Sequence, residues 1–176
     1  MATLFLMVGL PGAGKSTRAR DLAATRRALL LCLDEWMIPL FGEPDVGGKQ
    51  DVLEGRLISV ALAAARLGTS VVLDFGFWTR DERSSLRWLA ASDGVSCQVL
   101  YLPVDRETQL ERIVHRQATT PGQTYPMTEA DVDKWRLQFQ VPDATELYGR
   151  EIPAPPPGWA GWPEWAAGRW PSLAVR

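Results

Sequence analysis

The chain has 176 residues, 46% hydrophobic and 23% charged, which suits one domain with a sizeable core and differs from the composition of a disordered segment. A formal net charge of −2 excludes an overall positive field that would attract nucleic acid or an anionic membrane, although a local basic groove remains compatible with it. No apolar stretch is long enough to span a bilayer, and the N-terminal residues have the pattern of a strand without the basic flank of a signal peptide. We therefore expect a cytoplasmic protein with no membrane partner.

The cysteines and the histidine exclude two further kinds of site. Cys32 and Cys97 lie far apart, each within an apolar run, which indicates two buried, reduced thiols and argues against a disulfide framework or a metal-binding knuckle. His115 is the single histidine of the sequence, so a histidine-based metal site or catalytic triad is not expected.

The chain alternates between segments with strand and helix patterns. Four short apolar runs have the length and composition of buried strands. In chain order these runs are residues 3–8, 28–33, 70–75 and 95–102. Apolar residues recur at helical spacing in the segments that follow Thr17, Gly48, Thr79, Asp105 and Thr128. This alternation predicts βαβ units and an α/β fold, in which helices cover both faces of a parallel sheet.

Three local features carry weaker signals. Residues 39–48 hold two prolines and three glycines and are expected to form a loop. Residues 147–152 are the one candidate for a fifth strand. The fourth of the expected helices is predicted to place Leu110, Ile113 and Val114 on one face.

The composition changes after Pro153, and we therefore divide the chain into a main domain of residues 1–146 and a C-terminal tail of residues 147–176 that is rich in proline and tryptophan. Half of the eight tryptophans lie in this tail: Trp159, Trp162, Trp165 and Trp170. We favour an extended or short helical segment whose indoles pack back onto the domain. The alternatives are a flap that covers the substrate and a surface that binds another protein.

Residues 9–16, Gly-Leu-Pro-Gly-Ala-Gly-Lys-Ser, match the phosphate-binding motif G-x-x-x-x-G-K-[ST]. Its glycines let backbone N–H groups turn inward around phosphates at a helix N-terminus, where the helix dipole favours anions. Lys15 is expected to reach the β- and γ-phosphates and Ser16 to bind magnesium. The expected strand before the motif and helix after it fit this mechanism. The residues predicted to contact the nucleotide are Gly9, Pro11, Gly12, Ala13, Gly14, Lys15, Ser16 and Thr17.

Two acidic residues end expected strands, at the sheet edge where ligands bind in α/β folds. Asp74 has the position of an acid that holds magnesium, directly or through water; the alternative is a cap of the next turn. Asp34 can accept the proton of an attacking hydroxyl group or orient it; the alternative is an N-cap of the following helix. Trp36 is expected either to line a substrate pocket or to fill the core.

Two pairs of arginines are candidates for contacts with phosphate or substrate. Arg112 and Arg116 lie four residues apart on one helix face that leads into a polar segment, and guanidinium groups there can hold phosphoryl oxygens during transfer. The alternative is a solvated surface. Arg80 and Arg83, just beyond Asp74, are candidate substrate contacts; the alternative is salt bridges with the acidic residues between them.

Together these residues resemble a group of small P-loop kinases related to the kinase module of polynucleotide kinase, chloramphenicol phosphotransferase and zeta toxins. The matching pieces are residues 9–17, 33–35 (Leu-Asp-Glu), 71–75 (Val-Val-Leu-Asp-Phe) and 110–112 (Leu-Glu-Arg), with Arg116, Trp135, Phe139 and Pro142. The likeness covers residues 3 to about 146, and its first motif is the highly specific one. The residues after Tyr148 match no pattern of this group.

The resemblance implies a three-layer P-loop NTPase fold with a mostly parallel core sheet in the strand order 2-3-1-4, flanked by helices, and a small helical lid near residues 112–128. It implies ATP bound across the P-loop with Mg²⁺, Asp34 as the base for the acceptor hydroxyl, and a lid arginine on the phosphates. Asp34 is followed here by Glu35 and Trp36, whereas the polynucleotide enzymes tend to carry an Asp and a nearby Arg. A nucleic-acid substrate is therefore not favoured.

These observations support one main hypothesis, an ATP- and Mg²⁺-dependent kinase, monomeric or homodimeric, that phosphorylates a hydroxyl of a small molecule such as a metabolite or antibiotic. One alternative is a 5′-hydroxyl polynucleotide kinase, which would need a basic channel beside Asp34. Another is a nucleotide-dependent switch or partner-binding ATPase, which has no need of a base that faces an acceptor. The sequence holds no guanine-binding N-K-x-D motif, which favours ATP over GTP.

Overall fold

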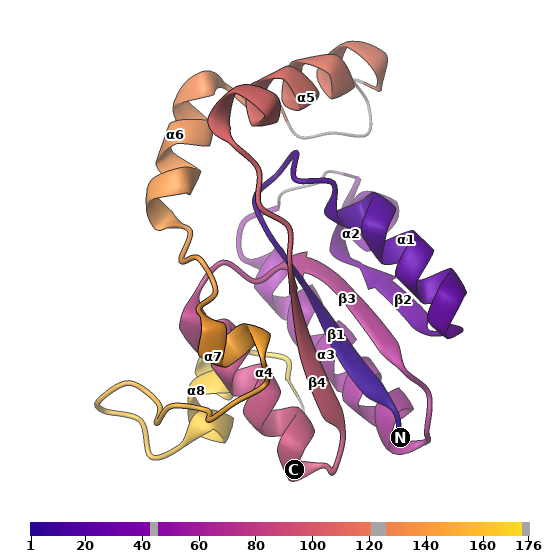
Figure 1. The fold of residues 1–176 in the computed structure, drawn as a ribbon, viewed down its shortest axis with the longest axis vertical. Helices are drawn as coiled ribbons and strands as arrows, with labels where there is room; N and C mark the ends of the chain where they lie inside the picture. Colours follow the sequence, from indigo (N-terminus) through magenta and orange to yellow (C-terminus); the bar gives the residue numbers. More distant parts are fainter. Residues whose placement is uncertain (43–45, 121–125, 174–176) are drawn as a thin grey trace.

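Four parallel strands form one sheet in the order β2-β3-β1-β4 (Figure 1). The computed structural model describes residues 1–42, 46–120 and 126–173. The strands are β1 (Thr3–Val8), β2 (Leu29–Cys32), β3 (Val71–Gly76) and β4 (Ser96–Tyr101). The α/β class and the strand order 2-3-1-4 are thereby confirmed. Because every neighbouring pair is parallel, the carboxyl ends of all four strands meet at one edge of the sheet.

Helices cover both faces of the sheet and stand above its carboxyl edge (Figure 1). They are α1 (Lys15–Arg26), α2 (Leu33–Phe41), α3 (Lys49–Arg66), α4 (Arg80–Ser92), α5 (Arg106–Thr119), α6 (Glu129–Gln138), α7 (Ala144–Leu147) and α8 (Trp162–Arg169). The helices expected after Thr79, Asp105 and Thr128 are present: capping boxes open α4 at Thr79 and α6 at Thr128, and the Asp105 carboxylate caps α5. Among the described residues, no helix is both long and apolar enough to cross a membrane.

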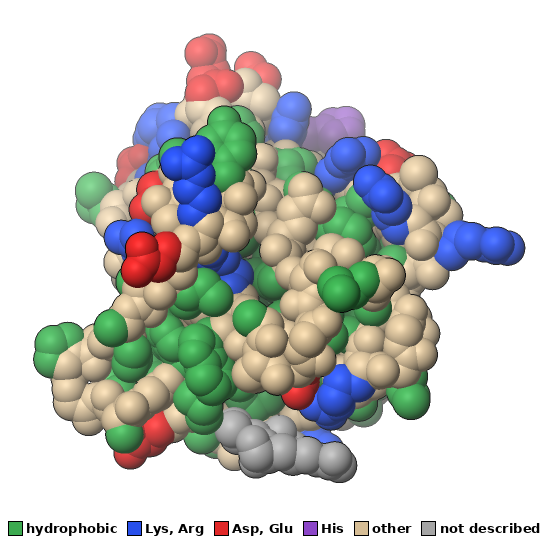
Figure 2. All heavy atoms as spheres, turned by 60° about the horizontal axis from the view of Figure 1, so that its bottom comes forward, with side chains coloured by type: hydrophobic (Ala, Val, Ile, Leu, Met, Phe, Trp, Pro, Cys, Tyr) green, Lys and Arg blue, Asp and Glu red, His purple; other side chains and the backbone are tan. Residues whose placement is uncertain are grey.

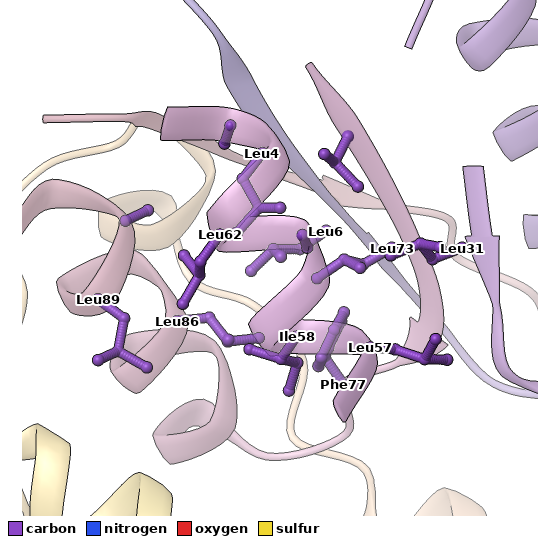
Figure 3. Close-up of a cluster of buried hydrophobic side chains, with 14 of the residues drawn as sticks. Leu4, Leu6, Leu31, Leu57, Ile58, Leu62, Leu73, Phe77, Leu86 and Leu89 are labelled. Carbon is purple, nitrogen blue, oxygen red and sulfur yellow. The ribbon is translucent and has the colours of Figure 1, made fainter. Parts of the chain in front are cut away.

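The side chains of β1 alternate between two apolar layers. Leu4 and Leu6 lie with α3 and α4, where Leu57, Ile58, Leu62, Leu86 and Leu89 complete the larger core cluster (Figure 3). Phe5 and Met7 point to the opposite face and pack against Leu22 of α1. Alternate residues of a strand face opposite sides of a sheet, so a central strand that is apolar throughout fits a three-layer arrangement.

The loop expected over residues 39–48 begins later than predicted. α2 continues past Pro39 and ends at Gly42, which has a left-handed φ of 77° and donates its N–H to the Ile38 carbonyl at 2.8 Å. Glycine takes this conformation without steric cost and so ends the helix cleanly. Residues 43–45 lie outside the described part of the chain.

The candidate fifth strand over residues 147–152 is wrong. Asp143 and Glu146 form a capping box that starts the short helix α7, and Gly149 after it has a φ of 63°, which no strand residue adopts. The expected apolar face of α5 is also narrower than predicted, since Ile113 is buried while Val114 is 63% exposed.

Three of the four tail tryptophans form a chain of edge-to-face contacts. The ring centroids of Trp162 and Trp165 are 5.7 Å apart, and those of Trp165 and Trp170 are 6.0 Å apart. Trp162 and Trp170 are almost fully buried, whereas Trp159 remains half-exposed. α8, which carries two of these residues, packs against α4. The structure therefore places these indoles in the core, while the domain boundary at residue 146 stays a prediction.

Arg169 joins the tail to three carboxylates on α3 and α4. Its guanidinium lies 2.6 Å from Asp51, 2.8 Å from Glu82 and 3.6 Å from Glu54. The Trp170 indole N–H also donates to Glu54 at 2.7 Å. Burial raises the pKa of Glu54 to about 7, although Arg169 and the Trp170 hydrogen bond favour its charged form.

Truncation after Ala154 should lower stability by several kcal/mol, since it removes the buried residues Trp162, Trp170 and Leu173, each worth roughly 1.5–3 kcal/mol. It also leaves the carboxylates around Arg169 without their cation. Thermal or urea unfolding of the truncated and intact chains measures the difference. A truncated protein that is monomeric, equally stable and equally active would show that the tail is not part of the core.

Glu54→Gln should stabilise the protein above pH 7 and leave it nearly unchanged at pH 4. The folded-state pKa of Glu54 is raised, so the folded chain binds the proton more tightly, and stability is lost as pH rises from about 4.5 to about 7. Glutamine keeps the acceptor for Trp170 but cannot ionise, and the melting temperature at pH 8 should rise by roughly a few degrees. Glu107→Gln, at an exposed position, controls for the loss of one charge. A lower melting temperature for Glu54→Gln at pH 8 would mean that Arg169 and Trp170 outweigh burial.

Candidate active site

A cavity of about 640 Å³ opens where the carboxyl ends of the strands meet α2, α5 and α6. It brings together residues that the sequence predicted from four separate segments. The predicted residues that line it are Pro11, Gly12, Gly14, Lys15, Ser16, Thr17, Asp34, Asp74, Arg112 and Arg116. A concave site with several converging charged groups is the usual form of an active site in this class of fold.

The loop between β1 and α1 has the backbone shape that its glycines allow. Gly9, Gly12 and Gly14 have φ values of 154°, 82° and 87°. A β-carbon on Gly9 would lie 2.8 Å from the Leu102 carbonyl oxygen, so a side chain does not fit there. Gly14 precedes α1 without a side-chain cap, which leaves the first N–H groups of α1 free to bind an anion. The loop therefore fits a phosphate chain.

Lys15 is the first residue of α1 and is held on the loop itself. Its Nζ donates to the Leu10 carbonyl at 3.0 Å. Burial lowers the pKa of Lys15, while the charges of Asp74 and Asp34 oppose that shift. The ammonium group thus lies near both carboxylates, at the phosphate side of the cavity.

Asp74 is a buried carboxylate on β3, opposite Cys32 of β2 in the sheet register. The Cys32 thiol donates to Asp74 Oδ2 at 3.7 Å, and burial together with Asp74 raises the pKa of Cys32 to about 12, so the thiol stays protonated. A thiol is a weak donor for a buried carboxylate. Asp74 therefore has the capacity to bind a cation, and Ser16 lines the same cavity.

Magnesium fits this donor set better than a metal held entirely by protein. Among the described residues, no three His, Cys, Asp or Glu side chains come close enough to hold a metal ion. Mg²⁺ keeps most of its waters and takes one or two protein oxygens together with phosphates. Ser16 and Asp74 can supply those oxygens.

Asp34 lies in the first turn of α2 and faces the cavity. Asp34 is not the N-cap of α2, which was the alternative considered for it, because the N-cap is Cys32. Asp34 is exposed to the open cavity. Desolvation by the surrounding protein and the charge of Asp74 raise its pKa, and Lys15 and Arg116 oppose the shift. A carboxyl group with a raised pKa is a better proton acceptor than one at its ordinary value.

Arg112 and Arg116 reach the cavity from α5. Arg112 donates from Nη1 to the Gly12 carbonyl at 3.0 Å, and Arg116 is half-buried in the cavity wall. Of the lid predicted over residues 112–128, the structure describes the end of α5, Thr120 and residues 126–128, which lead into α6. Residues 121–125 lie outside the described part.

Arg83, Arg80 and Trp36 are absent from the described lining of the cavity. Arg83 is fully buried and its guanidinium binds Glu146 at 2.7 and 3.0 Å, so the prediction that it contacts substrate is wrong. Its salt bridge goes to α7 and not to the acidic neighbours considered from the sequence. Arg80 pairs with Asp143 at 2.9 Å, and Trp36 is 43% exposed.

Two tryptophans that received no role from the sequence also line the cavity. Trp78 follows β3, and Trp135 lies on α6; their ring centroids are 6.0 Å apart in an edge-to-face contact. Asp131 and Lys134 of α6 stand beside them in the wall. Trp78 lies four residues after Asp74 in the sequence, and this short separation could have predicted that it lines the cavity. The cavity positions of the α6 residues could be found only from the tertiary structure.

The glycine-rich loop, the helix after it and the parallel sheet define a P-loop NTPase fold, and such a fold implies nucleotide binding. Residues 4–142 match the AAA domain family, and the chain belongs to that family. A comparison with curated proteins finds no match.

Solved structures share this fold at low sequence identity. A chain of the Pnkp1/Rnl/Hen1 RNA repair complex is 18% identical over 78% of this chain, with a TM-score of 0.68, and this chain spans only 43% of its length. A gluconokinase from Sinorhizobium meliloti is 17% identical, covers 83% of this chain and 78% of its own, and has a TM-score of 0.54. Kti12 from Chaetomium thermophilum, in complex with ADP-AlF3, is 18% identical over 98% of this chain and 100% of its own, with a TM-score of 0.59.

Lys15→Ala should weaken ATP binding about tenfold or more, because it removes the main side-chain charge beside the bound phosphates. Isothermal titration with ATP measures the change. Lys49→Ala, which removes a lysine outside the cavity lining, is the matched control. An ATP affinity for Lys15→Ala within twofold of wild type would contradict the assignment of the loop.

Proposed function

We propose that the protein is an ATP- and Mg²⁺-dependent phosphotransferase that phosphorylates a hydroxyl group of a small molecule. The observation that carries this proposal is that Asp34 faces the same cavity as the phosphate loop, near enough to Lys15 and Asp74 for their charges to act on its carboxyl group. A nucleotide switch needs the loop and a metal acid but has no use for a further carboxylate in front of the phosphates.

The cavity lining combines two kinds of groups. The loop, Lys15 and the α5 arginines supply N–H groups and positive charge for phosphates. Asp34 of α2 and the indoles of Trp78 and Trp135 also line the cavity and supply a carboxylate and aromatic surface. Aromatic walls with a few polar groups are typical of small-molecule sites.

In the proposed reaction, the acceptor hydroxyl lies against Asp34 and in line with the γ-phosphate of ATP. Its oxygen forms the new bond to phosphorus, the bond to the β–γ bridging oxygen breaks, and ADP leaves. The hydroxyl proton passes to the Asp34 carboxylate and then to solvent. Arg112 and Arg116 hold the phosphoryl oxygens as charge moves. Bound Mg²⁺, held by Ser16 and Asp74, would neutralise charge on the phosphates.

Similar proteins and surface charge support a small acceptor. Neighbours in fold include a gluconokinase and a sugar kinase, as well as the RNA repair protein. The cavity lining carries the carboxylates of Asp34, Asp74 and Asp131 among its cations, and these carboxylates disfavour a polyanionic acceptor. Figure 2, which turns the bottom of Figure 1 and not the cavity edge toward the reader, shows Lys and Arg side chains among acidic and hydrophobic ones on the described part of that face. We therefore favour a metabolite or antibiotic over a 5′-hydroxyl oligonucleotide.

A phosphate-transfer screen tests the proposal directly. Radiolabelled ATP and Mg²⁺ are incubated with the protein and with sugars, nucleosides, aminoglycosides or 5′-hydroxyl oligonucleotides. We expect label on at least one small molecule. Label on oligonucleotides alone would replace the proposal by its polynucleotide alternative, and ATP hydrolysis without any acceptor would favour the switch.

Asp34→Asn should keep ATP affinity and lower turnover by roughly 10² to 10⁴, the usual contribution of a positioned general base. The raised pKa of Asp34 adds a pH signature: wild-type turnover should fall as pH drops through this pKa, and the variant should lack that limb. Glu35→Gln changes the neighbouring exposed carboxylate and serves as control. Lost ATP affinity with intact turnover in Asp34→Asn would make Asp34 a structural residue.

A further inference from the structure

α5 holds the backbone of the phosphate loop through two of its side chains. Gln109 is completely buried, and its Nε2 donates to the Pro11 carbonyl at 3.0 Å. One turn later, Arg112 donates to the next carbonyl of the loop, that of Gly12. A β-carbon on Gly12 would lie 3.2 Å from the Gln109 carbonyl oxygen, so loop and helix are in close contact.

The Gln109 side chain is itself held by α6. Arg136 donates from Nη1 to Gln109 Oε1 at 2.9 Å and to the Val104 carbonyl at 3.1 Å. A guanidinium can only donate and a carbonyl can only accept, so the amide has one orientation that satisfies both partners. A neutral amide of this length is the side chain that can accept from Arg136 and donate to Pro11 at once.

The direction of the Pro11 carbonyl also fixes a donor for phosphate. In a planar trans peptide the carbonyl of one residue and the N–H of the next point in opposite directions. The hydrogen bond from Gln109 to the Pro11 carbonyl therefore turns the Gly12 N–H to the opposite side, and Gly12 lines the cavity. Leu10, the preceding residue, is held by Ala13 N–H and Lys15.

We propose that Gln109 is a positioning residue for nucleotide binding, which keeps the Gly12 peptide in the orientation that presents its N–H to phosphate. Arg136 of α6 holds the Gln109 amide in place, so the two side chains form a hydrogen-bonded relay from α6 to the Pro11 carbonyl. The relay joins α6, which carries the cavity residues Asp131, Lys134 and Trp135, to the loop on the other side of α5. The inference rests on nucleotide binding by the loop and not on the identity of the acceptor.

Binding of ATP and of inorganic tripolyphosphate to the wild type and to Gln109→Met, measured by isothermal titration, tests the inference. Methionine has a similar length and no charge but can make neither hydrogen bond. Because the loop contacts phosphates alone, both ligands should bind roughly fivefold to tenfold more weakly, by the same factor. Arg136→Met keeps the Gln109 amide and should show a smaller loss. Gln117→Met is the matched control, since Gln117 lies on the same helix and donates to the Met127 carbonyl at 2.9 Å without contact to the loop.

The melting temperature of each unliganded variant separates positioning from mere stability. We expect Gln109→Met to lose more stability than Gln117→Met, because Gln109 is completely buried and loses two hydrogen bonds, while Gln117→Met should lose some stability without any loss of affinity. Affinities of Gln109→Met within twofold of wild type, or equal losses in the control, would overturn the inference. Failure of the wild type to bind either ligand would overturn it together with nucleotide binding. A failed acceptor screen leaves this test intact, because only binding is measured.

Discussion

An anion can bind at the start of α1 only if the backbone N–H groups of residues 9–16 turn toward it, and glycines with positive φ make that turn possible. The surrounding structure is built closely around this loop. The Leu102 carbonyl after β4 lies against Gly9, and Gln109 of α5 lies against Gly12. The loop therefore needs β1 in the middle of the sheet, with β4 and its following helix beside it. Most of the site geometry follows from that placement.

The strand order also sets the order of chemical groups across the cavity. β2 leads to Asp34, β3 carries Asp74, β1 leads to the phosphate loop, and β4 leads to α5 with its arginines. Neighbouring strands in a sheet lie about 5 Å apart, so groups at their carboxyl ends are spaced at roughly the distance between an acceptor, a metal and a phosphate chain. A parallel sheet in another order would separate Asp74 from the loop. The proposed chemistry thus depends on topology as much as on residue type.

Features that depend on short stretches of chain were predictable from the sequence. The Thr79 and Thr128 capping boxes, the four strands and the glycine loop each need only neighbouring residues, and all are present. Gly149 is a local feature of the sequence that argues against a fifth strand, since glycine readily adopts the left-handed conformation that it has here.

Features that join distant parts of the chain could not be predicted in this way. Arg83 has the same local pattern as a substrate-binding arginine, but its partner Glu146 lies 63 residues away. The cavity positions of Trp135 and Lys134 likewise follow from how α6 stands over the sheet. Strand order came from a resemblance to known kinases and not from periodicity, because an apolar run carries no information about its neighbours in a sheet.

The hydrogen bond between Trp170 and Glu54 joins residues 116 positions apart, and it bears on how the chain folds. Contacts of such sequence separation raise the contact order, and chains rich in them fold slowly. The entropy cost of closing a loop grows only slowly with its length. We therefore expect any slow folding to come from the need for α3 and α4 to form before α8 has a surface to dock on. Until then, the apolar side of α8 and the carboxylates that Arg169 neutralises stay exposed to water. We therefore expect α8 to dock late in folding, and we expect the chain to be more open to chaperones and to self-association before it docks.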